Sequence, residues 1–372
     1  MTPLAIAFFG SSLVSAYWNG AATYYRGVLR ALAGRGHRIV FYEPDAYDRQ
    51  AHRDIADPDW AEIIVYPANE AGVGRALERA RDADLVVKAS GVGVFDRLLE
   101  TAVPAIRRQG TIAAFWDVDA PATLDRVARH ADDPFRALIP AYDLILTYGG
   151  GPPVVAAYRR LGARCCVPIY NGLDPATHHP APPQPRFACD LGLVANRLPD
   201  RERRIEEFFL AVAAARPRER FLLAGSGWQD KELPPNVGYI GHLYTRDHNA
   251  FNASARAVLN VSRDSMAAYG YSPATRVFEA AGAGACVVTD AWEGISQFFE
   301  PGREILVAES GAAVADHLAR LTPREARRIG AAARRRALAE HTYDRRVDRL
   351  EAVLRGVAFR GPRAAQPRGA GP

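Results

Sequence analysis

Short apolar stretches recur through the first 170 residues, and a stretch long enough for a helix separates most of them. The strands that this pattern predicts are residues 4–9, 38–42, 62–66, 85–88, 111–115, 144–147 and 165–168. Because neighbouring parallel strands need a crossover of helix length between them, the regular alternation indicates a parallel α/β sheet. We therefore predict one doubly wound, Rossmann-like domain in this part of the chain.

A second alternation of the same kind follows a stretch at residues 170–185 (YNGLDPATHHPAPPQP) that is rich in Pro, Asn, Gly and His. Such a composition is typical of a connection between domains. The strands expected beyond it are residues 191–195, 220–224, 237–240, 257–261, 286–289 and 305–307. The predicted fold class is α/β with two parallel-sheet domains, and 372 residues are enough for both.

The composition limits the partners and the compartment. The net charge of +5 is modest for this length, so nucleic acid is not predicted, whereas an anionic substrate or loose peripheral contact with an acidic membrane surface fits. Cys165, Cys166, Cys189 and Cys286 lack the spacing of a metal site and indicate free thiols in a reducing cytoplasm. No apolar run reaches the ~20 residues of a membrane span, and no signal peptide is recognised. Abundant Arg and Ala with little Lys indicate a GC-rich bacterial genome, so we expect a cytoplasmic bacterial protein.

Candidate site residues concentrate in the run at residues 269–308. This run predicts a short helix at residues 275–283 and a buried strand at residues 286–289, followed by a loop, a helical turn and a last strand. In open α/β sheets, ligands bind at the carboxyl ends of the strands, where the polar residues of this run collect. Glu279, near the end of the predicted helix, is well placed to accept hydrogen bonds from a pair of hydroxyls, such as those of a ribose.

The segment SPATRVFEAAGAGACVVTD, continued by GISQFFEPGREILVA, resembles the C-terminal half of nucleotide-sugar glycosyltransferases with the two-domain GT-B fold. The pattern is similar to that of the spore-maturation-protein CgeB-like group, whose wider relatives are the retaining family-4 glycosyltransferases. The resemblance covers most of residues 185–345 and extends only loosely over residues 1–184. In the family-4 relatives, a Glu, seven residues and a second Glu precede a small-residue helix. Glu279 matches the second Glu, but Tyr271 takes the place of the first, which lies near the donor sugar in those relatives.

The resemblance implies which ligand each domain binds. Residues 1–184, linker included, would bind the acceptor, and residues 185–342 would bind the nucleotide sugar. Residues 343–356 would form a helix that crosses back onto the first domain. The composition of residues 357–372 predicts a disordered tail.

Basic residues of the second domain are the expected ligands of the donor diphosphate. In the relatives, the loop after its first strand supplies them, so Arg197 and Arg201 are the leading candidates, with Arg204 in reserve. The planar guanidinium group binds phosphate oxygens bidentately. Arg263 and Arg276 are further candidates for phosphate or sugar. A solvated loop for the first pair, and an ion pair with a neighbouring carboxylate for Arg263 or Arg276, remain open as alternatives.

Glycine-containing turns are the expected lining of the nucleotide site. In the relatives, turns at the positions of Gly225 and of Gly241 with His242 line the nucleotide. The other expected donor-binding residues are Asn196, Ser272, Glu279, Glu293 and Gly294. In the first domain, the Gly10–Ser11 turn either holds a phosphate at a helix N-terminus or is a plain turn, and the three-glycine dinucleotide fingerprint is absent.

Asp117, Asp119 and Tyr271 are the candidate catalytic residues. The two aspartates follow a predicted strand and could act as a general base or bind acceptor hydroxyls, although Asp119 could equally cap the following helix. Their D-x-D spacing also matches a metal–diphosphate motif, but enzymes of the GT-B fold generally need no metal, so no metal and no other cofactor is expected. His242 is the one histidine expected near the donor. The histidines expected to be solvated are His37, His178 and His179.

Together these features predict a metal-independent glycosyltransferase that moves a hexose-type sugar from a nucleoside-diphosphate sugar to a saccharide, lipid or protein acceptor. The family-4 likeness implies retention of anomeric configuration. A nucleotide-sugar 2-epimerase of the same fold is one alternative. A non-catalytic nucleotide-sugar-binding protein is another, because Tyr271 replaces a glutamate.

Overall fold

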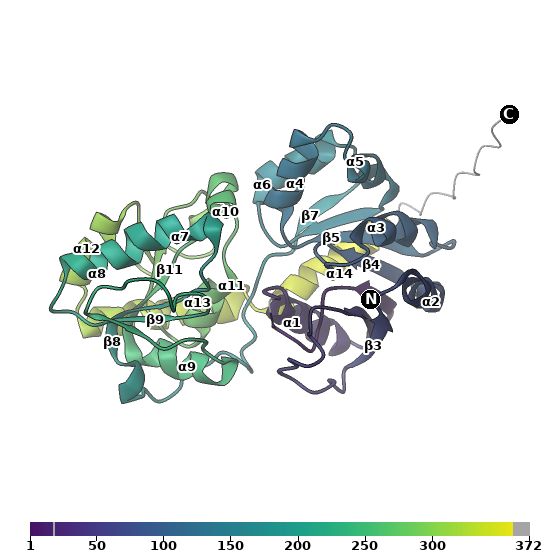
Figure 1. Ribbon diagram of the computed structural model, residues 1–372. Helices are drawn as coiled ribbons and strands as arrows, with labels where there is room; N and C mark the ends of the chain where they lie inside the picture. The colour runs from purple at the N-terminus through teal and green to yellow at the C-terminus, as the bar shows by residue number, and fades with distance from the viewer. Residues whose placement is uncertain (18, 360–372) are drawn as a thin grey trace. The chain divides into compact units, whose positions relative to one another are not determined.

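The computed structural model describes residues 1–17 and 19–359. The chain divides into two compact units (Figure 1). Unit 1 comprises residues 1–170 together with the C-terminal segment from residue 344 onward, and unit 2 comprises residues 171–343. Each unit is built around its own parallel sheet, as the alternation of strands and helices predicted.

Unit 1 contains a seven-stranded parallel sheet in the order β3-β2-β1-β4-β5-β6-β7. Its strands are β1 (Ala5–Phe9), β2 (Arg38–Asp45), β3 (Ala61–Pro67), β4 (Leu85–Ala89), β5 (Ile112–Asp117), β6 (Leu144–Thr147) and β7 (Cys166–Pro168). The helices between them are α1 (Ala22–Ala33), α2 (Glu70–Ala80), α3 (Asp96–Ala105), α4 (Ala120–Arg129), α5 (Pro134–Leu138) and α6 (Gly151–Arg160). The central strands are buried along their whole length, as expected of a sheet with helices on both faces.

Aromatic side chains fill the centre of unit 1. Phe8 on β1 pairs in register with Phe41 on β2, and their stacked rings lie 5.3 Å apart. Trp116 on β5 lies 5.7 Å from the Phe8 ring and is fully buried. Large aromatic surfaces removed from water supply much of the stabilisation of such a core.

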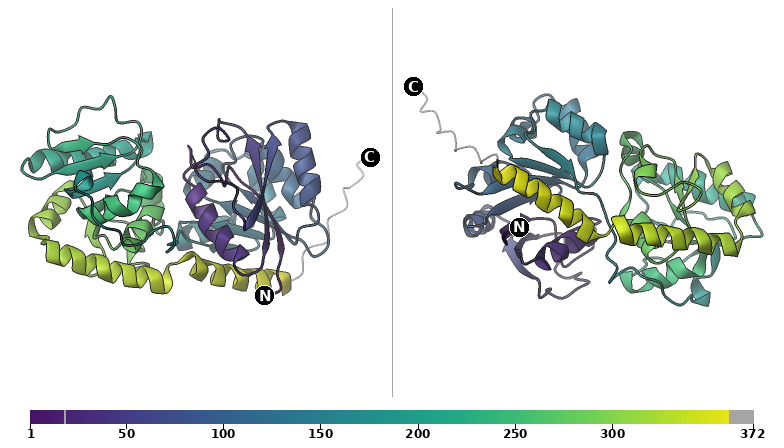
Figure 2. Two further views of the ribbon diagram at one scale, coloured as in Figure 1. Left: turned by 90° about the horizontal axis from the view of Figure 1, so that it is seen from below. Right: turned by 180° about the vertical axis from the view of Figure 1, so that it is seen from behind.

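The last helix, α14 (Tyr343–Phe359), packs on unit 1 (Figure 2). Arg35, just beyond α1, forms an ion pair of 2.8 Å with Asp348, and His37 Nε2 lies 3.1 Å from Glu351 Oε1. The crossing-back of the last helix is therefore confirmed. His37 is 4% exposed, so its predicted solvation was wrong, because α14 covers it. Residues 357–359, predicted as part of the tail, continue α14, and the rest of that tail lies outside the described residues.

Unit 2 contains a six-stranded parallel sheet in the order β10-β9-β8-β11-β12-β13. Its strands are β8 (Cys189–Val194), β9 (Phe221–Ala224), β10 (Val237–Tyr239), β11 (Ala255–Asn260), β12 (Val287–Asp290) and β13 (Leu306–Ala308). Its helices are α7 (Pro199–Ile205), α8 (Ala211–Ala215), α9 (Thr245–Ser254), α10 (Asp264–Tyr269), α11 (Thr275–Gly282), α12 (Gly311–Arg320) and α13 (Pro323–Glu340). A π-helical turn at Glu206–Leu210 joins α7 to α8.

The residues after position 170 belong to unit 2, whereas the sequence pattern assigned the connection up to residue 184 to the first domain. Hydrogen bonds explain the difference. Leu173 N donates to His341 O at 2.8 Å, and Tyr343 N donates to Leu173 O at 3.0 Å. Asn171 Nδ2 donates to Pro273 O at 3.1 Å. The segment is thus fixed to unit 2 through its backbone.

Small residues allow α11 and α13 to pack closely. A Cβ atom added at Gly330 would lie 2.0 Å from Gly284 O, and one added at Gly282 would lie 2.3 Å from Leu173 Cδ1. This is the close approach that the run of Ala and Gly after Glu279 predicted. It fixes α11, and with it the side chains of Arg276 and Glu279.

Candidate functional site

Each sheet has one point at which the strand order reverses. In unit 1 this point lies between β1 and β4, and in unit 2 between β8 and β11. Ligands of doubly wound sheets bind outside the carboxyl ends of the strands at such points. The loops that follow these strands contain Ser11 and Ser90 in unit 1, and Asn196 and Arg263 in unit 2.

Backbone hydrogen bonds join the loops after β8, β9 and β10. Ser226 N donates to Asn196 Oδ1 at 2.9 Å, and Gly225 N donates to Gly241 O at 2.7 Å. Gly225 has a φ of 128°, and an added Cβ atom there would lie 2.1 Å from Ala195 O. Only glycine allows this approach. The structure therefore brings the predicted Asn196, Gly225 and Gly241 together at one edge of the sheet.

Two guanidinium groups near this edge lack carboxylate partners. Arg201 Nη2 donates to Asn196 O at 2.7 Å, while the buried Arg201 Nε has no hydrogen-bond partner among the described residues. Burial and the neighbouring charge of Arg276 lower the pKa of Arg201 to about 10, so Arg201 is cationic at neutral pH. Within the described chain, Arg276 is half-buried and has neither a hydrogen bond nor an ion pair of 4.0 Å or less. The two side chains thus place adjacent, poorly neutralised positive charge at this edge of the sheet.

The other predicted arginines are already neutralised. Arg197 forms ion pairs with Glu202 at 2.8 Å and Asp230 at 3.0 Å. Arg263 forms an ion pair of 2.5 Å with Asp200, and Arg204 forms one of 2.6 Å with the fully buried Asp290. For Arg263, the ion pair with a carboxylate that the sequence left open is thus present. Because carboxylates occupy these side chains, Arg201 and Arg276 are the better ligands for an external anion.

Glu279 is a buried carboxylate that receives no hydrogen bond from any described residue. It lies on α11, one turn after Arg276, and only 6% of its surface is exposed. Burial on its own would raise the pKa of Glu279, but the nearby His178, Arg276 and His248 lower it below the usual value. The group is therefore ionised at neutral pH, with its acceptor capacity available to hydroxyl groups.

Two histidines lie next to Glu279. His178 Nε2 is 3.9 Å from Glu279 Oε1, and the His178 ring stacks on the ring of His248 with 5.8 Å between centroids. His178 is 2% exposed, so its predicted solvation was wrong: it packs beneath α11 instead of facing water. His179, in contrast, is exposed as predicted. His248 was missed, although it precedes the buried Phe251 and Asn252 by three and four residues on the inner face of α9.

Tyr271 and Glu293 form a second polar pair in unit 2. Tyr271 has a φ of 46°, its backbone N donates to Glu293 O at 2.6 Å, and its hydroxyl donates to Glu293 Oε1 at 2.9 Å. An added Cβ atom at Gly294 would lie 2.1 Å from the Tyr271 ring, so this contact requires the glycine. Ser272 is buried and donates to Gly270 O at 2.9 Å, which gives it a role in the turn.

His242 is exposed, and its ring lies edge-on to the ring of Tyr244 with 4.7 Å between the ring centroids. The histidines beside Glu279 are the buried His178 and the partly exposed His248, and neither is the His242 that the sequence suggested.

In unit 1, the predicted Gly10–Ser11 turn is packed into the domain. An added Cβ atom at Gly10 would lie 2.5 Å from the Phe41 ring, and Ser11 Oγ donates to Asn19 Oδ1 at 2.9 Å. Arg49 Nη1 donates to Ser11 O at 3.1 Å and to Val92 O at 3.3 Å. These contacts make Gly10 and Ser11 structural, and Arg49 is a buried cation that sequence reasoning missed.

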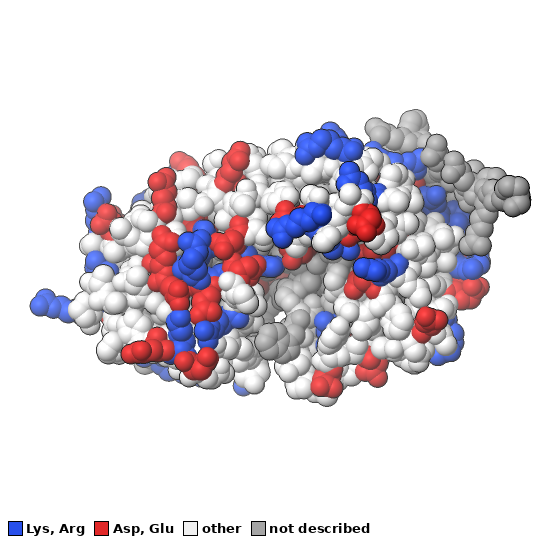
Figure 3. All heavy atoms as spheres, turned by 45° about the horizontal axis from the view of Figure 1, so that its top comes forward, with Lys and Arg blue, Asp and Glu red and all other residues white. Residues whose placement is uncertain are grey.

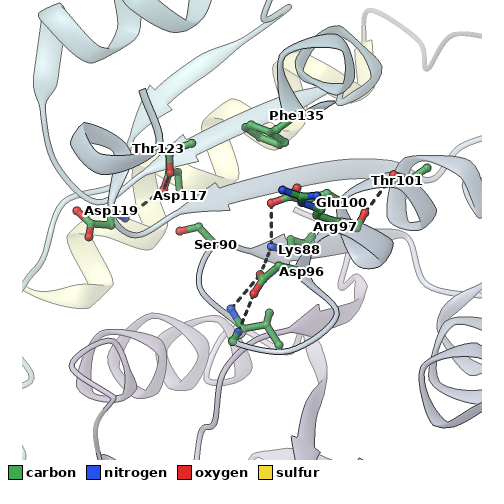
Figure 4. Close-up of polar contacts among 12 residues, drawn as sticks. Lys88, Ser90, Asp96, Arg97, Glu100, Thr101, Asp117, Asp119, Thr123 and Phe135 are labelled. Carbon is green, nitrogen blue, oxygen red and sulfur yellow. Dashed lines mark hydrogen bonds and ion pairs between the residues drawn. The ribbon is translucent and has the colours of Figure 1, made fainter. Parts of the chain in front are cut away.

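The predicted catalytic aspartates of unit 1 differ in accessibility (Figure 4). Asp117 is fully buried and accepts hydrogen bonds from Thr123 Oγ1 at 3.0 Å, from Asp119 N at 3.1 Å and from the Tyr158 hydroxyl. Burial raises the pKa of Asp117 above its usual value despite these bonds. Asp119 is partly exposed at the start of α4 and does not cap that helix with its side chain. Of the two, Asp119 is the one that an external group can reach.

Lys88 lies beside this region, at the end of β4 (Figure 4). It is fully buried, with Asp96 at 2.5 Å and Glu100 at 3.5 Å. Such a group tolerates burial because its charge is balanced, and this assigns Lys88 to the structure of unit 1.

On the face that Figure 3 shows, acidic and basic side chains of the described residues are interspersed. This pattern differs from the single-sign patches of proteins that bind nucleic acid.

A family model described as glycosyl transferase-like matches residues 201–352. This span contains Arg201, Arg276 and Glu279. No curated protein sequence matches the chain.

Solved structures are similar to this chain over nearly its whole length. Sucrose-phosphate synthase from Thermosynechococcus elongatus is similar with a TM-score of 0.68 and 16% identity, over 96% of this chain and 99% of that one. HepE from Anabaena, in complex with UDP-glucose, is similar with a TM-score of 0.68 and 14% identity, over 95% and 100%. AviGT4, a glycosyltransferase involved in avilamycin A biosynthesis, is similar with a TM-score of 0.61 and 19% identity, over 96% and 98%.

The chain has a GT-B fold. The two Rossmann-like parallel-sheet units are the architecture that it shares with these structures. No helix in the described part of the GT-B chain combines the length and the hydropathy that a bilayer span requires.

Proposed function

We propose that the protein is a glycosyltransferase that binds a nucleoside-diphosphate sugar in unit 2 and transfers the sugar to an acceptor held by unit 1. The observation that carries this proposal is the pair of ionised groups on α11. Arg276 and Glu279 lie one helical turn apart, and neither has a hydrogen-bond partner among the described residues. A cation that can take a phosphate beside a carboxylate that can take two hydroxyls is the complement of a nucleoside diphosphate.

In this proposal, Arg201 and Arg276 bind the diphosphate and Glu279 accepts hydrogen bonds from the ribose. The N-terminus of α11 contributes as well, because its N-cap residue, Ala274, leaves the first-turn amides without a side-chain cap. Glu293, held by Tyr271, would contact the donor sugar in place of the glutamate that the family-4 pattern has at position 271.

The chemistry that follows separates charge. The sugar becomes cationic as its bond to the diphosphate breaks, and the diphosphate leaves with an additional negative charge. Arginine side chains fixed before the reaction stabilise that leaving group without reorganising, and each such donor contributes about 3–4 kcal/mol in well-studied oxyanion sites. A helix N-terminus adds about 0.3–1 kcal/mol, or up to about 2 kcal/mol when partly buried. This set needs no metal, and metal independence is part of the proposal.

Several finer features are proposed on the strength of resemblance. The HepE structure contains UDP-glucose, which makes a UDP-sugar the first donor to test. The residue pattern supports a place near the CgeB-like group and the retaining family-4 enzymes, and hence hexosyl transfer with retention. A cytoplasmic location with peripheral membrane contact, and a saccharide, lipid or protein acceptor, complete the proposal.

A second candidate function rests on Tyr271, because a tyrosine cannot supply the carboxylate of the family-4 pattern. A nucleotide-sugar 2-epimerase, or a protein that binds the nucleotide sugar without turnover, is compatible with this change. An epimerase would isomerise the donor without an acceptor and without a change in mass. A binding protein would show donor affinity without transfer or hydrolysis.

The deciding experiment is a thermal-shift screen against UDP, GDP, dTDP, CDP and ADP, with and without EDTA. A ligand at 100 times its dissociation constant stabilises the folded state by about 2.7 kcal/mol. We expect one nucleotide to raise the melting temperature of the wild type and of Arg197→Ala to a similar extent, and that of Arg276→Ala by clearly less. If none of the five stabilises the wild type, unit 2 does not bind nucleoside diphosphates and the proposal fails.

A further inference from the structure

Three ligand-type side chains from separate segments of unit 2 meet beneath α11. They are His178 from the segment before β8, His248 from α9 and Glu279 from α11. One nitrogen or oxygen atom of each lies within 4.8 Å of the others. His178 Nε2 and Glu279 Oε1 are 3.9 Å apart.

Two ring nitrogens in this cluster have unsatisfied hydrogen-bonding capacity. His178 Nε2 and His248 Nδ1 are both buried, and neither has a hydrogen-bond partner in the described part of the chain. His178 as a whole is 2% exposed. Buried polar atoms without partners are rare and need a specific explanation, such as a bound ion.

The protonation pattern suits coordination. His248 Nε2 lies 3.4 Å from Leu243 O, an arrangement in which Nε2 carries the proton and donates to the carbonyl. The lone pair is then on Nδ1, the unpartnered atom. Metal-binding histidines typically use their second nitrogen in this way. Burial lowers the pKa of His248 to about 4, so the ring is neutral at pH 7.

We infer that His178, His248 and Glu279 form a binding site for a divalent transition metal of the zinc class. Two imidazole nitrogens and one carboxylate are a donor set that zinc accepts, with a fourth position left for water. Ligand atoms around zinc lie about 3.4 Å apart for bonds of about 2.1 Å. The cluster needs a contraction on the order of 1 Å, which side-chain rotation can supply. His248 is partly exposed and provides the entry route.

A metal at this site would affect donor binding, and this consequence rests on the proposed function. Glu279 can ligate the metal or accept the ribose hydroxyls, so metal and nucleotide would compete. Arg276 should affect the binding of the metal and of the nucleotide in opposite directions. Its positive charge acts on both Glu279 and His248, so it opposes a metal while it favours a diphosphate.

The test is titration of the full-length, EDTA-treated and desalted protein with Zn²⁺ by calorimetry, and with Co²⁺ by visible absorption. We expect one site per chain, with the ligand-field bands of a nitrogen–oxygen environment and no thiolate charge-transfer band. The absent thiolate band distinguishes this site from the adjacent Cys165 and Cys166. His248→Ala and Glu279→Gln should each weaken binding by about 100-fold or more, since even outer-shell changes cost about 10–100-fold.

His179→Ala is the matched control, because the neighbouring His179 is exposed and outside the cluster. It should bind metal as the wild type does. His178→Ala alone is not a sufficient test, because removing a buried ring can destabilise the fold. The melting temperature of each variant, measured without metal, shows whether that variant folds.

Arg276→Ala separates this inference from the proposed function. It should tighten Zn²⁺ binding several-fold while it weakens nucleotide binding. Failure of every nucleotide to bind would leave the direct metal titration unaffected. Absence of a Zn²⁺ site in the wild type, or an unchanged site in both His248→Ala and Glu279→Gln, would overturn the inference.

Discussion

The hydroxyl of Tyr271 donates a hydrogen bond of 2.9 Å to Oε1 of Glu293, 22 residues further along the chain. This bond raises the pKa of Tyr271, so the phenol remains a neutral donor at physiological pH. In the family-4 pattern that the sequence resembles, a glutamate stands at the position of Tyr271, and the partner of Tyr271 is itself a glutamate. The carboxylate of Glu293 is thus in contact with Tyr271, the residue that stands where the pattern has a glutamate.

The pair leads to a prediction for turnover. Glu293→Gln should lower kcat by about 10- to 100-fold, because a hydrogen bond to a charged group contributes about 1.5–3 kcal/mol. The affinity for the free nucleoside diphosphate should stay unchanged, since the carboxylate is assigned to the sugar. Steady-state kinetics and nucleotide titration measure the two quantities. Tyr271→Phe should have a smaller effect in the same direction, and an equal loss of nucleotide affinity in Glu293→Gln would contradict the assignment.

Arg276 and Arg197 provide a matched comparison for donor binding. Arg276→Ala should raise the dissociation constant of the nucleoside diphosphate by about 10- to 100-fold, because it removes a charge-assisted contact. Arg197→Ala should change it by less than about twofold, because Glu202 and Asp230 already neutralise that side chain. Calorimetric titration of both variants is the measurement. Equal effects would show that the ion pairs of Arg197 open when the donor binds.

Gly330 should be sensitive to a single methyl group. Gly330→Ala places a Cβ atom 2.0 Å from the backbone oxygen of Gly284, so α13 and α11 must separate. We expect the free energy of unfolding to fall by about 1–3 kcal/mol, as in overpacked cores. Gly356→Ala in α14 is the control, since no atom lies within 4 Å of an added Cβ atom there. It should stabilise the protein by about 0.5–1 kcal/mol through helix propensity. Urea unfolding of the two variants gives both numbers, and a neutral Gly330→Ala would show that the helices have room to move.

Asp117 should make the stability depend on pH. Burial raises the pKa of its carboxyl in the folded state above the pKa in the unfolded chain. At pH values between these two pKa values, the folded protein binds the proton more strongly than the unfolded chain does. The contribution of Asp117 to stability is therefore present at low pH and is lost as pH rises through the folded pKa. Asp117→Asn should remove this component of the slope from about pH 4 upward. Urea unfolding across that range, compared with the wild type, is the measurement.

The same variant tests a catalytic role. Because Asp117 is fully buried and hydrogen-bonded on both oxygens, we expect Asp117→Asn to retain most of the turnover. Asp119→Ala should have the larger effect on kcat. Complete loss of turnover in Asp117→Asn with unchanged stability would show that this carboxyl takes part in the chemistry.

The strands and the two sheets were predictable because a parallel sheet leaves a local signal. Each buried strand is a short apolar run, and each crossover is a stretch long enough for a helix. The end of the first unit was not predictable from composition. Residues 171–184 have the composition of a linker, yet Asn171 and Leu173 are hydrogen-bonded to unit 2.

The site was predictable only where it depends on position along a strand or a helix. Glu279 and Arg276 share one helix, so their spacing fixes their proximity. Which arginine is neutralised depends on partners far away in the sequence, such as Asp230 for Arg197 and Asp290 for Arg204. His178 and His248 are 70 residues apart, and only the fold brings them to Glu279.

The order of the units along the chain bears on how the protein is made. Unit 2 is one continuous segment inserted before the last helix of unit 1. During synthesis the ribosome therefore releases all of unit 2 before α14 emerges, and the surface of unit 1 around His37 and Arg35 stays uncovered until α14 has been made. Loss of a few turns of α14, by a premature stop or by proteolysis, would damage the unit that is encoded first.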